Sequence, residues 1–91
     1  MVITLEDAKL YLRLDNNIEN VLIMSLIAAA QTLCEDIIRK KADELEELPE
    51  ILKVAVLYAV AYLYENREQA DHKELIKTLV GLLFGFRSEV F

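Results

Sequence analysis

The chain of 91 residues has the length of one domain, and the whole range 1–91 is predicted to form it. A charged content of 29% excludes a disordered tail, and two Gly and one Pro exclude fibrous and turn-rich all-β classes. A net charge of −6 disfavours tight binding to nucleic-acid phosphates. The hydrophobic content of 55% exceeds the ~45–50% of an average soluble chain, so the surplus must enter a core, a membrane or a partner.

The first helix is predicted from about Leu5 to Leu14. Thr4 is a good N-cap for it, and Asp7 occupies the N3 position, where a carboxylate favours the start of a helix. Residues 15–17 are rich in capping side chains and are predicted to end this helix.

The second helix is predicted to start near Ile18, with Asn17 as its cap, and to run to about Lys40. Its apolar residues form two adjacent stripes that together cover about half of the helix surface. Because such a face is wider than one neighbour can cover, the helix is expected to pack against two. The stripes are Leu22, Leu26, Ala29, Leu33 and Ile37, and Ile23, Ile27, Ala30, Cys34 and Ile38.

The third helix is predicted from about Pro49 to Glu68, after an acidic connection. In the connection, residues 43–50, five of eight side chains are acidic, which favours a capped and solvated helix entry over a metal or docking site. Thirteen of the fourteen residues 51–64 are apolar, a run shorter than the ~20 that a bilayer needs. A helix that is apolar all round must be buried on every side, so part of it is predicted to face another subunit.

The fourth helix is predicted to start near Asp71, which has the spacing of a capping box with Glu74, and to end at Gly85. The last six residues hold two of the three Phe, so the C-terminal tail is expected to dock on a surface. The four segments together predict an all-α fold, a small bundle of about four helices.

The residues that could carry chemistry are few. The only histidine, His72, has no nucleophile or orienting partner near it in the sequence, so we expect a surface side chain. Cys34 lies on an apolar stripe and is expected to be a small buried hydrophobic residue. No spacing indicates a zinc or calcium site, and no Gly-rich loop is available to hold a phosphate. No enzymatic activity, no cofactor and no metal are therefore expected.

An ordered set of segments extends over nearly the whole chain. Its parts are Ile3–Arg13 with Asp15, Leu22-Ile23 with residues 26–30, Leu48-Pro49, Tyr64-Glu65-Asn66-Arg67-Glu68, and Leu79, Leu82, Leu83 and Arg87. The set resembles the head–tail connector (adaptor) proteins of long-tailed bacteriophages and prophages. The segment Tyr-Glu-Asn-Arg after an apolar helix is its most specific part.

The resemblance implies a non-enzymatic protomer of a ring-forming oligomer, located in the virion at the head–tail junction after synthesis in the bacterial host cytoplasm. The ring would lie under the portal protein, extend the DNA channel and carry the tail or a stopper protein. Its partners would be other copies of the chain, the portal and the tail or stopper protein, with no membrane. DNA would pass through without specific binding, and an acidic protomer suits such a channel.

A ring protomer makes heterologous contacts and therefore needs two different contact faces. We expect contacts with subunits or partners on the third helix and at the C-terminus. Tyr64 and Arg67 are expected to fix the turn between the third and fourth helices. On this assignment Val60→Asp weakens assembly by more than about 1 kcal/mol, and burial of the helix inside one protomer would refute it. The expected contact residues are Val56, Val60, Leu63, Phe84, Phe86 and Phe91.

Two alternatives remain open from the sequence. The first is a small helical regulatory protein that acts as a dimer through partner binding, and it predicts a stable dimer at all concentrations. The second is an all-α enzyme, which requires a polar pocket with perturbed carboxylates.

Overall fold

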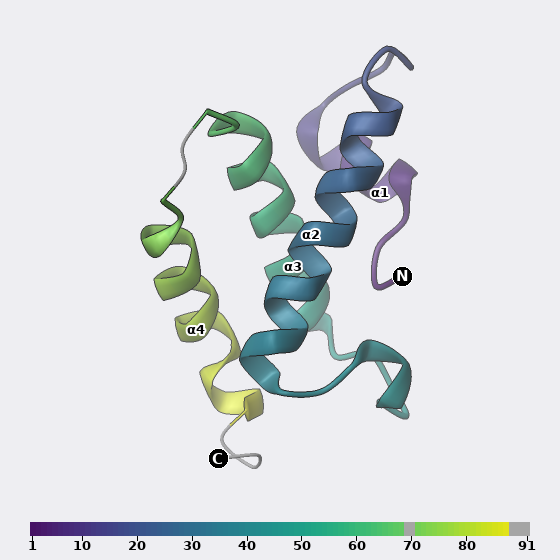
Figure 1. Cartoon of the computed structure of the whole chain (residues 1–91). Coiled ribbons are helices and arrows are strands. Elements are labelled where there is room, and N and C mark those ends of the chain that lie inside the picture. The colour runs from purple at the N-terminus through teal and green to yellow at the C-terminus, as the bar shows by residue number, and fades with distance from the viewer. Residues whose placement is uncertain (69–70, 88–91) are drawn as a thin grey trace.

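The computed structural model describes residues 1–68 and 71–87 of the chain. Four α-helices and one short 3₁₀ turn follow one another, and the described residues contain no strand (Figure 1). The predicted all-α bundle is therefore confirmed. The elements are α1 (Leu5–Leu12), α2 (Asn20–Ile38), η1 (Ala42–Glu44), α3 (Glu50–Glu65) and α4 (Lys73–Arg87).

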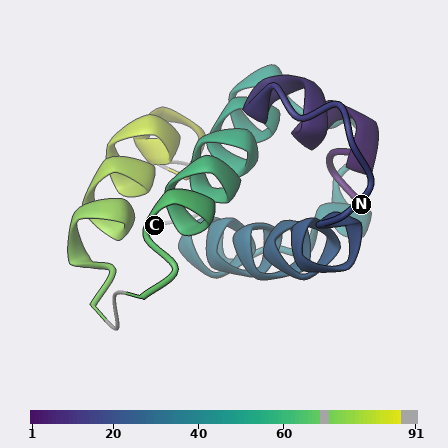
Figure 2. The same ribbon diagram turned by 90° about the horizontal axis from the view of Figure 1, so that it is seen from above.

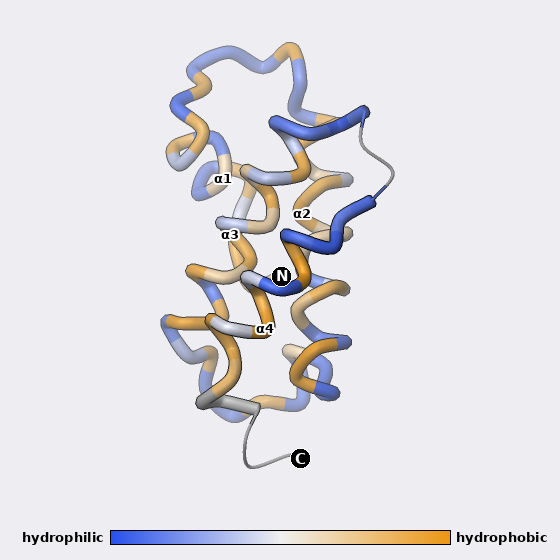
Figure 3. The backbone as a smooth tube through the Cα atoms, turned by 90° about the vertical axis from the view of Figure 1, so that its left-hand side faces the viewer, coloured by the Kyte–Doolittle hydropathy of each residue, from blue (hydrophilic) through white to orange (hydrophobic). Residues whose placement is uncertain are grey.

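The two central helices are α2 and α3, each of which contacts all three other helices. In the view of Figure 2, α2 runs along one edge of the bundle, α1 lies at the opposite edge, and α4 lies beside α3. The hydrophilic residues gather in the connections at the ends of the helices, as Figure 3 shows.

The start of α1 is as predicted. Thr4 Oγ1 accepts a hydrogen bond from Asp7 N at 3.0 Å, and Asp7 Oδ2 accepts one from Thr4 N at 2.9 Å. The helix ends two residues earlier than predicted, because Arg13 adopts a left-handed conformation with φ 61°. Its N–H donates to Leu10 O at 3.1 Å, which closes the last turn of the helix.

The start of α2 differs from the prediction. The helix begins at Asn20, with Glu19 in the N-cap position but without a side-chain cap. Asn17 does not cap it, since Asn17 Oδ1 accepts a hydrogen bond from Lys9 Nζ at 2.7 Å. At the other end Arg39 takes a left-handed conformation with φ 61°, so Lys40 lies outside the helix.

The remaining ends are close to their predicted places, with three corrections. Pro49 is the N-cap of α3 rather than its first residue, and α3 ends at Glu65 rather than Glu68. In front of α4, Asp71 Oδ1 accepts a hydrogen bond from Lys73 N at 3.0 Å. The predicted end at Gly85 is wrong, because α4 continues through this residue to Arg87.

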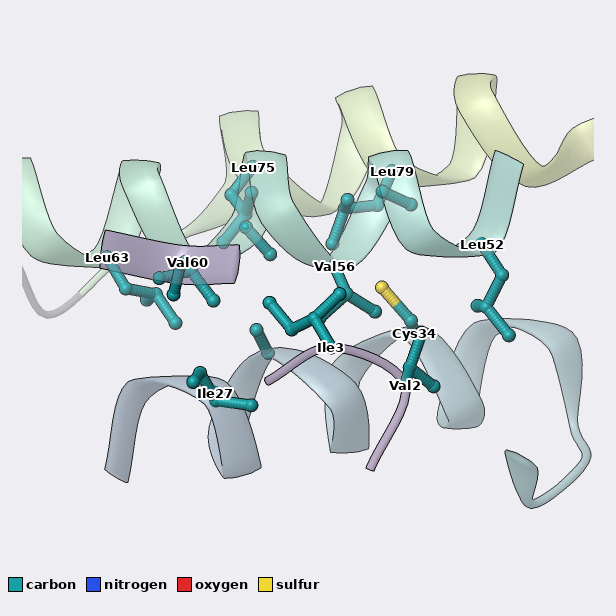
Figure 4. Close-up of a cluster of buried hydrophobic side chains, with 14 of the residues drawn as sticks. Val2, Ile3, Ile27, Cys34, Leu52, Val56, Val60, Leu63, Leu75 and Leu79 are labelled. Carbon is teal, nitrogen blue, oxygen red and sulfur yellow. The ribbon is translucent and has the colours of Figure 1, made fainter. Parts of the chain in front are cut away.

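One hydrophobic core joins all four helices and the N-terminal segment (Figure 4). Val2 and Ile3, which precede α1, are both buried in it. Val2 N also donates to Gln31 Oε1 on α2 at 2.7 Å, which fixes the N-terminal segment against that helix. The largest fully buried side chains are Ile23, Ile27, Cys34, Ile38, Leu52, Val56, Val60, Leu75, Leu79 and Leu83.

Candidate partner-binding surfaces

The three residues predicted to form the α3 part of the interface are the wrong ones, because their side chains belong to the core of the protomer. Val56 and Val60 are 0% exposed and Leu63 is 9% exposed. The neighbouring helices α1, α2 and α4, together with the N-terminal segment, enclose this side of α3. A fully buried side chain offers no surface to another subunit, so these three residues stabilise the fold instead.

The C-terminal residues of the predicted interface are only partly described. Phe84 on α4 is 66% exposed, which is a large apolar area open to a partner. The side chain of Phe86 and the whole of Phe91 lie outside the described residues. Contact of Phe84 with a partner therefore stays a prediction.

Tyr64 and Arg67 were predicted to fix the turn between α3 and α4, but their hydrogen bonds among the described residues join α3 to α2. Both bind Glu19, which lies at the start of α2 and 45 and 48 residues away in the chain. Tyr64 Oη donates to Glu19 Oε1 at 2.6 Å, and Arg67 Nη1 donates to Glu19 Oε2 at 3.0 Å. The Arg67 guanidinium also lies 4.8 Å from the centre of the Tyr64 ring. The three side chains tie the end of α3 to the start of α2.

This cluster has a defined electrostatic character. The hydrogen bond from Tyr64, and then that from Arg67, hold the pKa of Glu19 below its ordinary value. The same bond to Glu19 raises the pKa of the Tyr64 hydroxyl above its ordinary value. Glu19 is thus kept as a carboxylate and Tyr64 as a neutral donor, which makes the cluster a structural tie.

An apolar face of α2 points away from the core. Ile18 and Val21 are 88% and 83% exposed, and Met24 is 42% exposed. No charged residue occurs in the whole stretch Asn20–Cys34. We call this surface the α2 face; its members are Ile18, Val21, Met24, Ser25, Ala28, Ala29 and Thr32, all exposed.

The length and apolar composition of α2 are also those of a membrane-spanning helix. α2 is the one helix among the described residues that is long and apolar enough to cross a membrane, with a mean hydropathy of 1.7 over 18 residues. Core helices of soluble bundles have the same length and apolar composition.

One of the two apolar stripes predicted on α2 is fully buried; its members are Ile23, Ile27, Ala30, Cys34 and Ile38. Ala29 of the other stripe is exposed.

A second apolar surface is the groove between α1 and α3. Two shallow depressions of about 400 Å³ each adjoin there, and Tyr11 lines both. Leu10 on α1 is 81% exposed and Val54 on α3 is 48% exposed. We call this surface the α1–α3 groove; besides Tyr11 its apolar lining is Ile3, Leu10, Leu12, Val54, Leu57, Tyr58, Ala61 and Tyr62.

The apolar periodicity of the sequence does not predict these two surfaces. It indicates the stripes on the buried side of α2 but not the exposed Val21 and Met24 on the other side. The missing charge between Glu19 and Glu35 was the available signal, because an exposed helix face without charge is unusual in so acidic a chain.

The side chains that could carry chemistry have structural surroundings. Cys34 is buried as predicted, and burial raises the pKa of its thiol to about 12, so the reactive thiolate is suppressed. His72 is half-buried rather than a surface side chain, with its ring edge-on to Tyr62 at 6.2 Å between centres. Among residues 1–68 and 71–87, no group of three or more His, Cys, Asp or Glu side chains could hold a metal ion.

Comparison with known families gives one match. The sequence model of the family described as phage gp6-like head-tail connector protein matches residues 2–88. The match begins at the buried Val2 and extends over all four helices, so it includes both apolar surfaces. No curated protein and no solved structure matches the chain.

Proposed function

The chain belongs to the phage gp6-like head-tail connector family, and from this we propose that its copies form a ring under the portal of a filled phage head. The family is structural rather than enzymatic, and its members are virion components of the head–tail junction. The proposed ring extends the DNA channel and offers a platform to the tail or a stopper protein. The chain is made in the bacterial host cytoplasm before it joins the virion.

The observation that carries the proposal is the extent of the family match, residues 2–88 of a 91-residue chain. The exposed apolar surfaces support it. A ring protomer contacts two neighbours through two different surfaces, and this chain has two, the α2 face and the α1–α3 groove. The enzyme alternative requires a polar pocket with a perturbed carboxylate. Among the described residues the carboxylate with a lowered pKa is that of Glu19, and it is engaged in a structural tie, so it does not favour this alternative.

The acidity of the chain supports a passive channel. With a net charge of −6 per copy, a ring of many copies repels DNA phosphates and lets the duplex slide without binding. We expect the surface that faces the channel to be acidic or neutral. A basic channel surface in the assembled ring would contradict this part of the proposal.

The test is electron microscopy of the purified chain mixed with isolated portal assemblies. The expected result is a ring of added density that shares the axis of the portal, with portal alone as the control. Since a ring protomer can remain monomeric until its portal is present, a monomer in free solution agrees with the proposal. A stable dimer at all concentrations that adds nothing to the portal contradicts it and favours a dimeric regulatory protein.

A further inference from the structure

We propose that neighbouring copies of this chain contact each other by seating the α2 face of one copy in the α1–α3 groove of the next. The inference rests on the proposed ring and assigns its subunit contact. The occupant of each surface is therefore a second copy of the same chain, and every copy uses both surfaces.

The α2 face is suited to close contact with another protein. Its exposed side chains are apolar or small and uncharged, and the opposite side of α2 is already held in the core. Ser25, Ala28 and Ala29 in the middle of the face let a neighbouring surface approach the backbone, while Ile18 and Val21 project at one end. No described residue of the same copy covers this side of the helix, as the 83% exposure of Val21 shows.

The α1–α3 groove is suited to receive a helix. Its walls are α1 and α3, and Leu10 and Val54 on these walls are exposed although both are apolar. Three tyrosines line the groove, Tyr11, Tyr58 and Tyr62. Tyrosine combines an apolar ring with a polar hydroxyl, which is typical of an interface that is partly in contact with water. An amphipathic or apolar helix that lies in such a groove is a common mode of protein recognition.

The two surfaces match in length. The uncharged stretch Asn20–Cys34 has 15 residues and therefore spans about 22 Å as a helix. The groove follows α3 from Glu50 to Glu65, 16 residues that span about 24 Å. A straight helix face of this length can therefore lie along the whole groove.

The charge distribution favours a second copy as the occupant. Two copies that each carry a net charge of −6 repel each other less when at least one of the two meeting surfaces has no acidic group. Asp7, Glu50 and Glu65 line the groove, and the one Lys there, Lys53, pairs with Glu50 at 3.6 Å. The uncharged α2 face places no carboxylate opposite these acids, whereas the acidic segment 43–50 would.

The positions of the two surfaces make the contact heterologous. In Figure 2, α1 and α2 lie at opposite edges of the bundle, so a copy that offers its α2 face to one neighbour keeps its groove for another. Such contacts propagate from copy to copy and close into a ring when the rotation permits it. A contact between two α2 faces would instead be isologous and would stop at a dimer.

Disulfide cross-linking tests the contact. Cys34 is the only cysteine of the chain and is fully buried, so we expect it not to form cross-links itself. A Val21→Cys protein and an isotopically labelled Leu10→Cys protein are mixed with isolated portal assemblies and oxidised with copper phenanthroline, and the masses of the products are measured by mass spectrometry. We expect the mixed dimer to form about tenfold faster than either homodimer, because the contact raises the effective concentration of the two thiols.

A Thr78→Cys protein is the matched control, since Thr78 is exposed on α4 and lies outside both surfaces. It should couple to Val21→Cys only at the slow rate of chance encounters. The proposal is overturned if Val21→Cys couples mainly with itself, or if the control couples with it as fast as Leu10→Cys does.

Aspartate variants separate this contact from the proposed function. Mixed with portal assemblies, Val21→Asp and Leu10→Asp should each fail to form a ring, while the unmodified chain forms one. If both variants join the ring as well as the unmodified chain, the contact is assigned wrongly and the ring function stands. If the unmodified chain itself adds no ring, the proposed function fails, whatever the cross-linking shows.

Discussion

The helices α2 and α3 are both strongly apolar, but they have opposite places in the molecule. On α3 most of the apolar side chains lie in the core, and Leu52, Val56 and Val60 are fully buried. On α2 one side is equally buried, while Val21 on the other side is 83% exposed. The apolar content of a helix therefore does not tell whether its surface is free for a partner, because this depends on the sides from which its neighbours pack against it.

The difference has a simple geometric cause. α3 lies between α1 and α4 and also packs against α2 (Figure 2), and the buried Ile3 lies beside its residue Val56 (Figure 4). α2 lies at an edge of the bundle, so its neighbours reach only one side of it (Figure 2). The edge helix α2 is thus left with an apolar outer face, whereas the exposed apolar side chain of α3, Val54, lies in the α1–α3 groove.

The largest effect that separates the two helices is expected for Val60→Asp. This change places a charge without a partner in a dry core and should lower the free energy of unfolding by about 4 kcal/mol. Since a domain of this kind has only about 5–15 kcal/mol of stability, this loss is a large share of the total and the variant should unfold at a much lower urea concentration. Urea denaturation followed by circular dichroism measures the change. A variant as stable as the original would mean that Val60 is not in the core.

A smaller effect is expected for Leu52→Ala, which leaves a cavity at another fully buried position of α3. The lost burial and the cavity together should lower the free energy of unfolding by about 3 kcal/mol. Val54→Ala on the same helix is the control, because its side chain is half-exposed and its truncation should change stability by less than about 0.5 kcal/mol. Equal losses at the two positions would contradict the described burial of α3.

Much of the fold could be predicted from the sequence, because local signals determine it. The capping box of Thr4 and Asp7 and the buried stripe of α2 around Ile27 both depend on residues three or four positions apart. The ends of α1 and α2 could not be predicted to the residue. Both helices end at an arginine in a left-handed conformation, Arg13 and Arg39. This conformation is usually indicated by a Gly or Asn in the sequence, and neither stands at these positions.

The candidate site could be predicted much less well. Periodicity shows which residues share a helix face, but it does not show which face another segment covers. The segment around Val2 and Ile3 is too short to have a pattern, yet both residues are buried in the core. Tyr64 and Arg67 likewise find their partner, Glu19, more than forty residues away, a pairing that no local spacing contains.

The capping box gives the next test, at a position that belongs to neither α2 nor α3. Thr4→Ala removes the hydrogen bond from Asp7 N to Thr4 Oγ1 and should lower the free energy of unfolding by about 1 kcal/mol. Thr78→Ala removes an exposed threonine from the interior of α4 and should change it by less than about 0.5 kcal/mol. Similar losses in both variants would show that the cap contributes nothing beyond a threonine side chain.

The tie between α2 and α3 should be visible in the pH dependence of stability. Because Tyr64 and Arg67 hold the pKa of Glu19 below its ordinary value, the folded state favours the carboxylate. The stabilisation is therefore complete above the ordinary pKa of a glutamate and is lost as the pH falls through the lowered pKa. In Glu19→Gln the melting temperature should fall less between neutral and acidic pH than in the unmodified chain. Glu46→Gln, in an exposed connection, should keep the original slope.

The smallest effect on stability is expected for Val21→Asp, which introduces the same charge on α2 that Val60→Asp introduces on α3. Val21 is exposed and lies in the first turn of α2, where a negative charge interacts favourably with the helix dipole. We therefore expect the free energy of unfolding to stay within about 0.5 kcal/mol of the original in urea denaturation. Loss of several kcal/mol would mean that this side of α2 is covered within the protomer, and it would then be unavailable to a second copy.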